Sequence, residues 1–338
     1  MCQIMECVPN FSEGRDPQKI KTLVRTIQSV GGVNVLHVDS GYAANRTVIT
    51  FAGKPELVVE AAFQAVKKAA GLIDMRFHSG EHPRFGATDV LPLVPVANIS
   101  MEETIEWSMK LGRRIGEELG ISVFCYENSA DSEQRRSLAL CRSGEYEGLA
   151  EKMKRPEWKP DFGPATLNAR SGAVALGARP FLIAYNVNLK TTDVGIARHI
   201  AGKIRESGCV MPGENRKIRL PGELKKLRAI GWFIREYGMA QVAMNLLDYS
   251  VTSVHQAFET VAVHAEQMGI EVAGSELIGL VPLAAILDTG RYYARRQGKV
   301  PDSADELICF ADRGLGLSQL SPFDPALRIL EYRVVQAE

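Results

Sequence analysis

The order of predicted secondary structure in the first seventy or so residues constrains the fold of this chain most strongly. A short apolar run predicts a buried strand at Ile4–Val8, and a helix follows that begins at Asp16 and Pro17 and ends at Gly31-Gly32. Two further apolar runs predict strands at Val33–Val38 and Thr47–Phe51. A second helix is predicted at Pro55–Ala70, with Gly71 as its stop. A later apolar run at Val90–Val96 predicts the next strand. This order favours helices that cover one face of an antiparallel sheet.

A similar order of elements recurs after Pro180. The second part predicts a strand at Phe181–Leu189, a helix that Thr192 caps and Gly208 ends, strands at Arg228–Arg235 and Gln241–Leu247, and a helix from Ser253 to Gly269. We therefore expect an α/β fold, an α+β sandwich of two ferredoxin-like βαββαβ subdomains, 1–180 and 181–338. The proline-rich segment 155–164 is the best candidate for the junction, and a ligand groove is expected between the subdomains.

Composition excludes several classes of protein. The 338 residues carry 40 Lys and Arg against 40 Asp and Glu, a balance that disfavours nucleic acid as the main partner. The six cysteines are scattered, and no run approaches about 18 apolar residues, so neither a disulfide scaffold nor a membrane span is expected. The acidic residues near the N-terminus do not suit a signal peptide. We expect a cytoplasmic protein with reduced thiols.

The densest group of polar residues lies between His78 and Asp89 and allows three interpretations. His78 to His82 matches the H-x-x-E-H pattern of zinc proteases, but that pattern needs a helix, and Gly80 and Pro83 oppose one here, so no metal is expected. The segment is otherwise a polar loop without chemistry, or a catalytic loop. In the catalytic interpretation, His82 acts as a general base and acid, because an imidazole exchanges protons near neutral pH.

Three weaker signals lie elsewhere. Asp39 follows a predicted strand and is either a turn residue or a group that projects from the sheet edge. The glycine-rich segment 163–172 is either a flexible loop or a backbone that approaches a flat ligand closely. The basic cluster of residues 216–228 is either a solvated face or a docking surface for a polyanion, and the search for cations that attract an anionic ligand would begin there.

Several motifs, taken in order, resemble the glutamate formimidoyltransferase family, that is, the formiminotransferase domain. The matching segments are 6–15, 45–53, 82–95, 161–164, 177–179, 181–186 and 274–282, so the resemblance covers most of the chain. The interior of the glycine-rich loop, 165–170, departs from the pattern of the animal members.

The resemblance implies transfer of a formimino group from N-formimino-L-glutamate to tetrahydrofolate in histidine degradation. It places the catalytic histidine on His82 and implies two subdomains with folate in the groove between them, in a homodimer. Animal members carry a cyclodeaminase domain that this chain is too short to include, so we expect the next step to belong to a separate protein. The folate-binding loop falls on Gly163, Pro164, Ala165, Thr166, Leu167, Asn168, Ala169, Arg170, Ser171 and Gly172.

Two further roles are hypotheses from residue chemistry. Asp39 is expected to orient the imidazole of His82 or to stabilise its charge, and Arg84 to bind a substrate carboxylate, because the arginine fork matches a carboxylate. Two alternative functions stay open. One is formyl transfer between 5-formyltetrahydrofolate and glutamate in the same site, and the other is a folate-binding module without chemistry.

Overall fold

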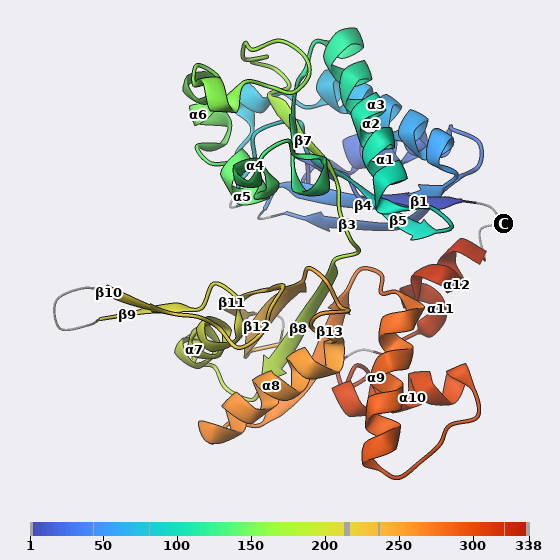
Figure 1. Ribbon diagram of the computed structural model, residues 1–338, viewed down its shortest axis with the longest axis vertical. Coiled ribbons are helices and arrows are strands. Elements are labelled where there is room, and N and C mark those ends of the chain that lie inside the picture. The colour runs from blue at the N-terminus through green and yellow to red at the C-terminus, as the bar shows by residue number, and fades with distance from the viewer. Residues whose placement is uncertain are drawn as a thin grey trace. The chain divides into compact units, whose positions relative to one another are not determined.

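The computed structural model describes residues 3–42, 44–80, 82–212, 217–235, 237–320 and 322–335. The chain divides into two compact units, Met1–Pro180 and Phe181–Glu338, which we call the N-terminal unit and the C-terminal unit. In Figure 1 the first runs from blue to green and the second from yellow-green to red. Both units combine helices with a sheet, which confirms the predicted α/β class.

The N-terminal unit is built on a seven-stranded sheet. Its strands are β1 (Ile4–Cys7), β2 (Asn10–Phe11), β3 (Val33–Gly41), β4 (Arg46–Gly53), β5 (Thr88–Ala97), β6 (Ser122–Cys125) and β7 (Ala173–Ala178). Its helices are α1 (Pro17–Gln28), α2 (Pro55–Leu72), α3 (Met101–Leu119), α4 (Glu133–Arg136), α5 (Leu138–Cys141) and α6 (Glu145–Lys152), with short 3₁₀ helices at Met75–Phe77, Glu127–Ser129 and Pro156–Trp158.

The strand order of this sheet contains a ferredoxin-like core. β1 and β2 lie between β4 and β5, all antiparallel, and β3 pairs with β4 on its outer side. The first and fourth strands of the βαββαβ unit are therefore neighbours. β7 then pairs parallel to β5, and β6 parallel to β7, which extends the sheet.

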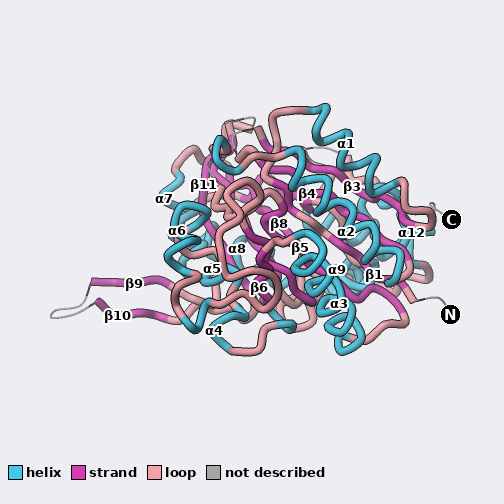
Figure 2. Tube along the Cα trace, turned by 90° about the horizontal axis from the view of Figure 1, so that it is seen from above, coloured by secondary structure: helices cyan, strands magenta, loops and turns pink. Residues whose placement is uncertain are grey.

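Three helices cover one face of this sheet because their apolar sides must be buried. Figure 2 shows α1, α2 and α3 over the strands. Met5 and Cys7 of β1 alternate with Glu6, so they enter the core beneath the helices. Other members of this core are Phe11, Leu23, Ile27, Ile49, Phe51, Val58, Leu91, Leu93, Leu111 and Ile115. As expected, Asp16 caps α1 by accepting hydrogen bonds from the backbone of the first turn, and Pro17 opens the helix.

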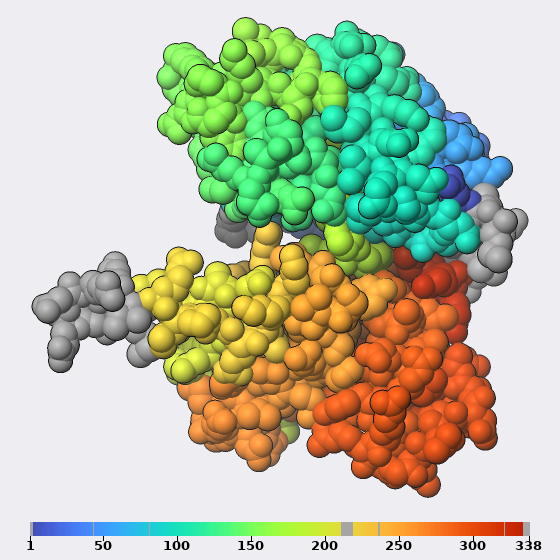
Figure 3. Space-filling view, viewed as in Figure 1, coloured from blue at the N-terminus to red at the C-terminus, as the bar shows by residue number. Residues whose placement is uncertain are grey.

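The C-terminal unit repeats the same topology with a four-stranded sheet. Its elements are β8 (Ile183–Leu189), α7 (Val194–Ile204), β9 (Cys209–Pro212), β10 (Lys217–Leu220), β11 (Leu227–Ile234), β12 (Met239–Leu246), α8 (Val254–Gln267), β13 (Val272–Ile278), α9 (Leu283–Arg296), α10 (Ala304–Leu315), α11 (Pro325–Arg328) and α12 (Leu330–Val335). β8 lies between β12 and β13, and β11 pairs with β12, all antiparallel. The β9–β10 pair is inserted between α7 and β11 and projects from the unit (Figure 2, Figure 3).

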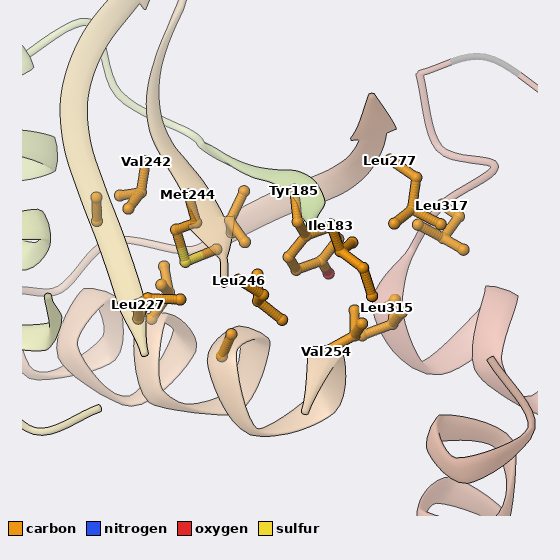
Figure 4. Close-up of a cluster of buried hydrophobic side chains, with 14 of the residues drawn as sticks. Ile183, Tyr185, Leu227, Val242, Met244, Leu246, Val254, Leu277, Leu315 and Leu317 are labelled. Atoms are coloured by element: carbon orange, nitrogen blue, oxygen red, sulfur yellow. The ribbon is translucent and has the colours of Figure 1, made fainter. Parts of the chain in front are cut away.

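The core of the C-terminal unit lies between its sheet and its helices. Figure 4 shows Ile183 and Tyr185 of β8 pointing into this core beside Leu277 of β13. The buried hydroxyl of Tyr185 donates to Ser275 Oγ at 2.8 Å, and Ser275 Oγ donates to the carbonyl of Leu315 at 2.7 Å. The hydroxyls of Tyr185 and Ser275 are therefore both paired inside the unit.

Three details of the sequence analysis are wrong. Gly71 does not stop α2, which continues to Leu72. Asp193, not Thr192, caps α7, because its carboxylate accepts from the backbone of Gly195 at 2.7 Å. The segment 155–164 does not join the two units: Trp158 is buried in the N-terminal unit, and the division follows Pro180. Pro156 opens the short 3₁₀ helix that contains Trp158, so the prolines do not make this segment a loose linker.

Candidate active site

His82 lies half-buried in the loop that precedes β5. Its Nδ1 is 2.8 Å from the carbonyl oxygen of Pro83. A carbonyl oxygen only accepts hydrogen bonds, so the neutral ring carries its proton on Nδ1 and keeps an unprotonated Nε2. The backbone therefore selects the tautomer in which Nε2 is the basic atom.

Two arginines pair with one carboxylate at the start of β5, close to the loop that carries His82. Asp89 is fully buried and accepts hydrogen bonds from Arg46 Nη1, from Arg142 Nη1 at 2.9 Å and from the backbone of Phe85 at 3.0 Å. Arg142 Nη1 also donates to the carbonyl of Pro83 at 3.1 Å. Arg142 thus contacts the same oxygen that holds His82.

These neighbours and partial burial lower the pKa of His82. Burial disfavours the charged ring most, the positive charge of Arg46 acts in the same direction, and Arg142 adds to it. The Pro83 carbonyl and Asp89 act in the opposite direction and offset part of the decrease. The imidazole therefore stays neutral, and basic at Nε2, at neutral pH.

The turn between β3 and β4 supports the loop that carries His82. Asn45 has a left-handed backbone with φ of 47°, accepts from the backbone of Gly14 at 2.9 Å and donates to the carbonyl of Ser79 at 3.0 Å. Its own carbonyl lies 2.9 Å from His78 Nε2. Gly80 passes so close that a Cβ there would lie 2.2 Å from the Ala44 carbonyl oxygen. These contacts fix the loop two residues before His82.

Arg84 already holds two carboxylates. Its guanidinium contacts Glu145 at 2.9 Å and Glu147 at 2.6 Å, and its Nε donates to His78 Nδ1 at 3.3 Å. The residue is buried, so these contacts tie the His82 loop to the start of α6. A substrate carboxylate at Arg84, as the sequence suggested, would have to displace one of the two glutamates.

Asp39 lies within β3, which extends to Gly41, rather than after its end. It pairs with Val48 across the hairpin and is exposed. Among the groups that shift the pKa of His82, the acidic one is Asp89 and not Asp39. The role of Asp39 as an orienting group stays a prediction.

The glycine-rich loop 163–172 ends against the start of β5. Gly86 and Gly172 form an isolated bridge, and the backbone of Ala87 donates to the carbonyl of Ser171 at 2.8 Å. A Cβ on Gly86 would lie 1.8 Å from the Ala173 carbonyl oxygen, and one on Gly172 would lie 2.2 Å from the Phe85 carbonyl oxygen. The structure therefore brings this loop and the His82–Asp89 segment together, although about eighty residues separate them.

The two halves of this loop differ in how tightly they are held. In the second half, Asn168 Oδ1 accepts from the backbone of Arg170 and Ser171, and the Arg170 guanidinium donates to the carbonyls of Ala70 and Gly71 at the end of α2. In the first half, Ala165 and Thr166 are exposed. The second half is thus held to the protein by side-chain hydrogen bonds, whereas the first half leaves its surface free for a ligand.

Two family models match nearly the whole chain. The model of the formiminotransferase domain, N-terminal subdomain, matches residues 4–179, and the model of the formiminotransferase domain matches residues 184–335. The chain belongs to the formiminotransferase domain family. The two matched ranges coincide closely with the N-terminal and C-terminal units.

The chain is similar to some relatives over nearly their whole length and to others over only part of it. The chain is 43% identical to the glutamate formimidoyltransferase of Streptococcus pyogenes, with 87% of the chain and 94% of the relative covered. It is 41% identical to that of Thermoplasma acidophilum, with 87% and 93% covered. It is 47% identical to the formimidoyltransferase-cyclodeaminase of Gallus gallus over 99% of the chain. It spans only about 60% of that relative's length.

The environment of His82 in this formiminotransferase chain includes two arginines that sequence reasoning missed, Arg46 and Arg142, which pair with Asp89. Arg46 and Asp89 lie in segments that carried the resemblance, but only the fold shows that they pair. Arg142 follows α5, sixty residues after His82 in the sequence, and no local pattern marks it. A search for arginines near a buried acid would have had too many candidates to select it.

The remaining sequence predictions concern the basic cluster, the H-x-x-E-H pattern and membrane-spanning segments. In the basic cluster, Lys225, Lys226 and Arg228 are exposed, while Arg216 lies outside the described residues. Glu81 of the H-x-x-E-H pattern also lies outside them, and within the described ranges no three His, Cys, Asp or Glu side chains group as metal ligands would. None of the described helices is long and apolar enough to cross a membrane.

Proposed function

We propose that this chain transfers the formimino group from N-formimino-L-glutamate to N5 of tetrahydrofolate, giving 5-formiminotetrahydrofolate and L-glutamate in histidine degradation. The observation that carries the proposal is the state of His82, whose Nδ1 proton is committed to Pro83 and whose Nε2 is therefore free to accept a proton. The names of the relatives that share this sequence support the same reaction.

His82 has two proton transfers in this reaction. Its Nε2 accepts the N5 proton as N5 forms a bond to the amidine carbon of the donor. The imidazolium then returns that proton to the glutamate nitrogen while the bond between this nitrogen and the amidine carbon breaks. One group performs both steps, so the proton balance closes within the site. Correct placement of the two substrates supplies a further part of the rate, because it converts a bimolecular reaction into one within a complex.

The loop 163–172 suits the flat ring system of tetrahydrofolate. Gly163 has φ of +80° and its Cβ position is filled by the Ile121 carbonyl, so glycine is required where the loop begins. Ala165 and Thr166 then present small exposed side chains, while the pinned second half holds the loop next to the His82 segment. Bound tetrahydrofolate supplies the accepting nitrogen, and the loop's part is to bind and orient it.

We also propose that the protein works as a homodimer, as the resemblance to the family implies, and in the cytoplasm, as its composition and scattered cysteines suggest. Sedimentation equilibrium of the purified protein tests the first point, and fractionation of cells that express it tests the second. A monomer at working concentration would contradict the homodimer.

A transfer assay tests the proposed function directly. Formation of 5-formiminotetrahydrofolate is followed with formiminoglutamate and tetrahydrofolate, and in parallel with N-formylglutamate as donor and with 5-formyltetrahydrofolate plus glutamate. We expect turnover with the formimino donor to exceed the other two. Preference for a formyl donor, or binding of folate without any product, would contradict the proposal. In the same assay, His199→Ala is the matched control for His82→Ala, because His199 is an exposed histidine on α7.

A further inference from the structure

We propose that Arg46 and Arg142 form an anion subsite that binds a carboxylate of the donor's glutamate moiety beside His82. This inference rests on the proposed function for the identity of the ligand. The existence of the subsite rests on the structure alone, because it follows from the charges and hydrogen bonds of these two side chains.

The charges of this group are unbalanced. Asp89 is the shared counter-ion of both arginines and is fully buried, so one negative charge faces two positive ones. The arginine side chains are 11% and 15% exposed. Both side chains are thus largely removed from water and keep a small accessible part. A net positive charge in such a place attracts an anion more strongly than one on an open surface.

The hydrogen bonds of the two arginines are also incomplete. Arg142 directs Nη1 to Asp89 and Pro83, while its buried Nε has no partner among the described residues. Arg46 directs Nη1 to Asp89 and Nη2 to Asn10 Oδ1 at 2.9 Å. A guanidinium has five N–H donors, so each group retains donors for an incoming carboxylate.

Arg84 provides the contrast within the same loop. It holds Glu145 and Glu147, so its local charge is already overcompensated. Arg46 and Arg142 are therefore better suited than Arg84 to hold a substrate anion, although Arg84 is the arginine closest to His82 in the sequence.

The position of Arg142 relates the subsite to the chemistry. Its Nη1 and His82 Nδ1 contact the same Pro83 oxygen, so only one atom separates the two groups. In the donor, a single carbon separates the α-carboxylate from the nitrogen that must depart. A carboxylate held by these arginines would thus keep the donor beside the His82 ring, whose Nε2 is the atom that exchanges the proton.

Steady-state kinetics of glutamine and lysine variants test the subsite. We expect Arg142→Gln and Arg46→Gln to raise the KM for formiminoglutamate by about 10- to 100-fold, since each removes charge-assisted hydrogen bonds, while the KM for tetrahydrofolate stays within about twofold. Arg142→Lys keeps the charge without the fork and should lie in between. Arg114→Gln on α3 is the control, because Arg114 is half-exposed, forms its ion pairs with Glu60 and Glu118 and lies over the ring of Phe63. A fall in kcat with an unchanged KM for the donor, or a rise in the KM for tetrahydrofolate, would overturn the inference.

Binding of glutarate separates this inference from the proposed function. Glutarate carries two carboxylates at the spacing found in glutamate, and calorimetry detects its binding without turnover. One outcome is that the unmodified protein binds glutarate, that Arg142→Lys weakens this binding, and that no transfer occurs. In that case the proposed function fails and the subsite stands. If transfer occurs but glutarate binds equally to the unmodified protein and to a folded Arg142→Lys or Arg46→Gln variant, the subsite is wrong. Circular dichroism shows whether each variant folds.

Discussion

Arg142 and His82 share one acceptor, the carbonyl oxygen of Pro83, at 3.1 and 2.8 Å. This oxygen fixes the proton on His82 Nδ1, and the shared contact brings a positive charge to the same side of the ring. The same group of contacts therefore sets both the tautomer and the pKa of His82. The Pro83 carbonyl determines that Nε2 is the basic nitrogen, and burial together with the two arginine charges lowers the pKa of the ring.

The pH dependence of transfer should report the lowered pKa of His82. The neutral ring is the base, so kcat/KM should fall as the pH drops through a value below 6.5, the ordinary value for histidine, and should be flat just above it. Arg142→Gln removes a positive charge that lowers this pKa, so its acid limb should move to higher pH. An acid limb above 6.5 in the unmodified protein, or a shift to lower pH in the variant, would contradict this account.

Alanine at Gly172 should destabilise the N-terminal unit. Its Cβ would lie 2.2 Å from the Phe85 carbonyl oxygen, and φ of +66° is unfavourable for alanine, so we expect a loss of at least about 2 kcal/mol in the free energy of unfolding. Gly71→Ala is the matched control within α2, where a Cβ meets nothing within 4 Å. It should raise stability by about 0.5–1 kcal/mol. Denaturant unfolding measures both, and equal effects would show that the close approach at Gly172 does not matter.

We expect Lys152 to stabilise residues 140–143, the segment that carries Arg142. Its buried ammonium donates to the carbonyls of Leu140 and Cys141 at 2.5 and 2.6 Å and lies 3.9 Å from the ring centre of Trp158. Lys152→Met should lower the free energy of unfolding by about 2 kcal/mol and reduce kcat/KM, because it leaves these carbonyls without their donor. Lys154→Met changes an exposed lysine and should alter neither quantity. If both variants behave alike, residues 140–143 do not depend on Lys152.

The fold was predictable from the sequence where local signals carry it. Asp16 with Pro17 and Ser253 mark helix starts through their own side chains, and the structure has α1 and α8 beginning there. At α7 the same kind of signal misled, because Thr192 and Asp193 can both cap a helix; the cap is Asp193, the residue type that helix N-caps prefer over threonine. In 155–164 the prolines suggested a linker, but burial of Trp158 depends on contacts that the local sequence does not express.

The site was predictable only in part, for a related reason. His82 and the loop 163–172 stand out through their residue types, and the resemblance gives them roles. The partnership of Arg46, Asp89 and Arg142 needs the fold, because β4, the start of β5 and the residue after α5 each contribute one member. Local sequence therefore identifies the group that performs the chemistry more readily than the groups that tune it.

The transfer rate of His82→Ala tests the central claim most directly. We expect kcat to fall by roughly 10²- to 10⁴-fold, as loss of a general base does, with partial recovery on addition of imidazole and with unchanged thermal unfolding. Near-normal turnover in this variant would show that His82 is not the base.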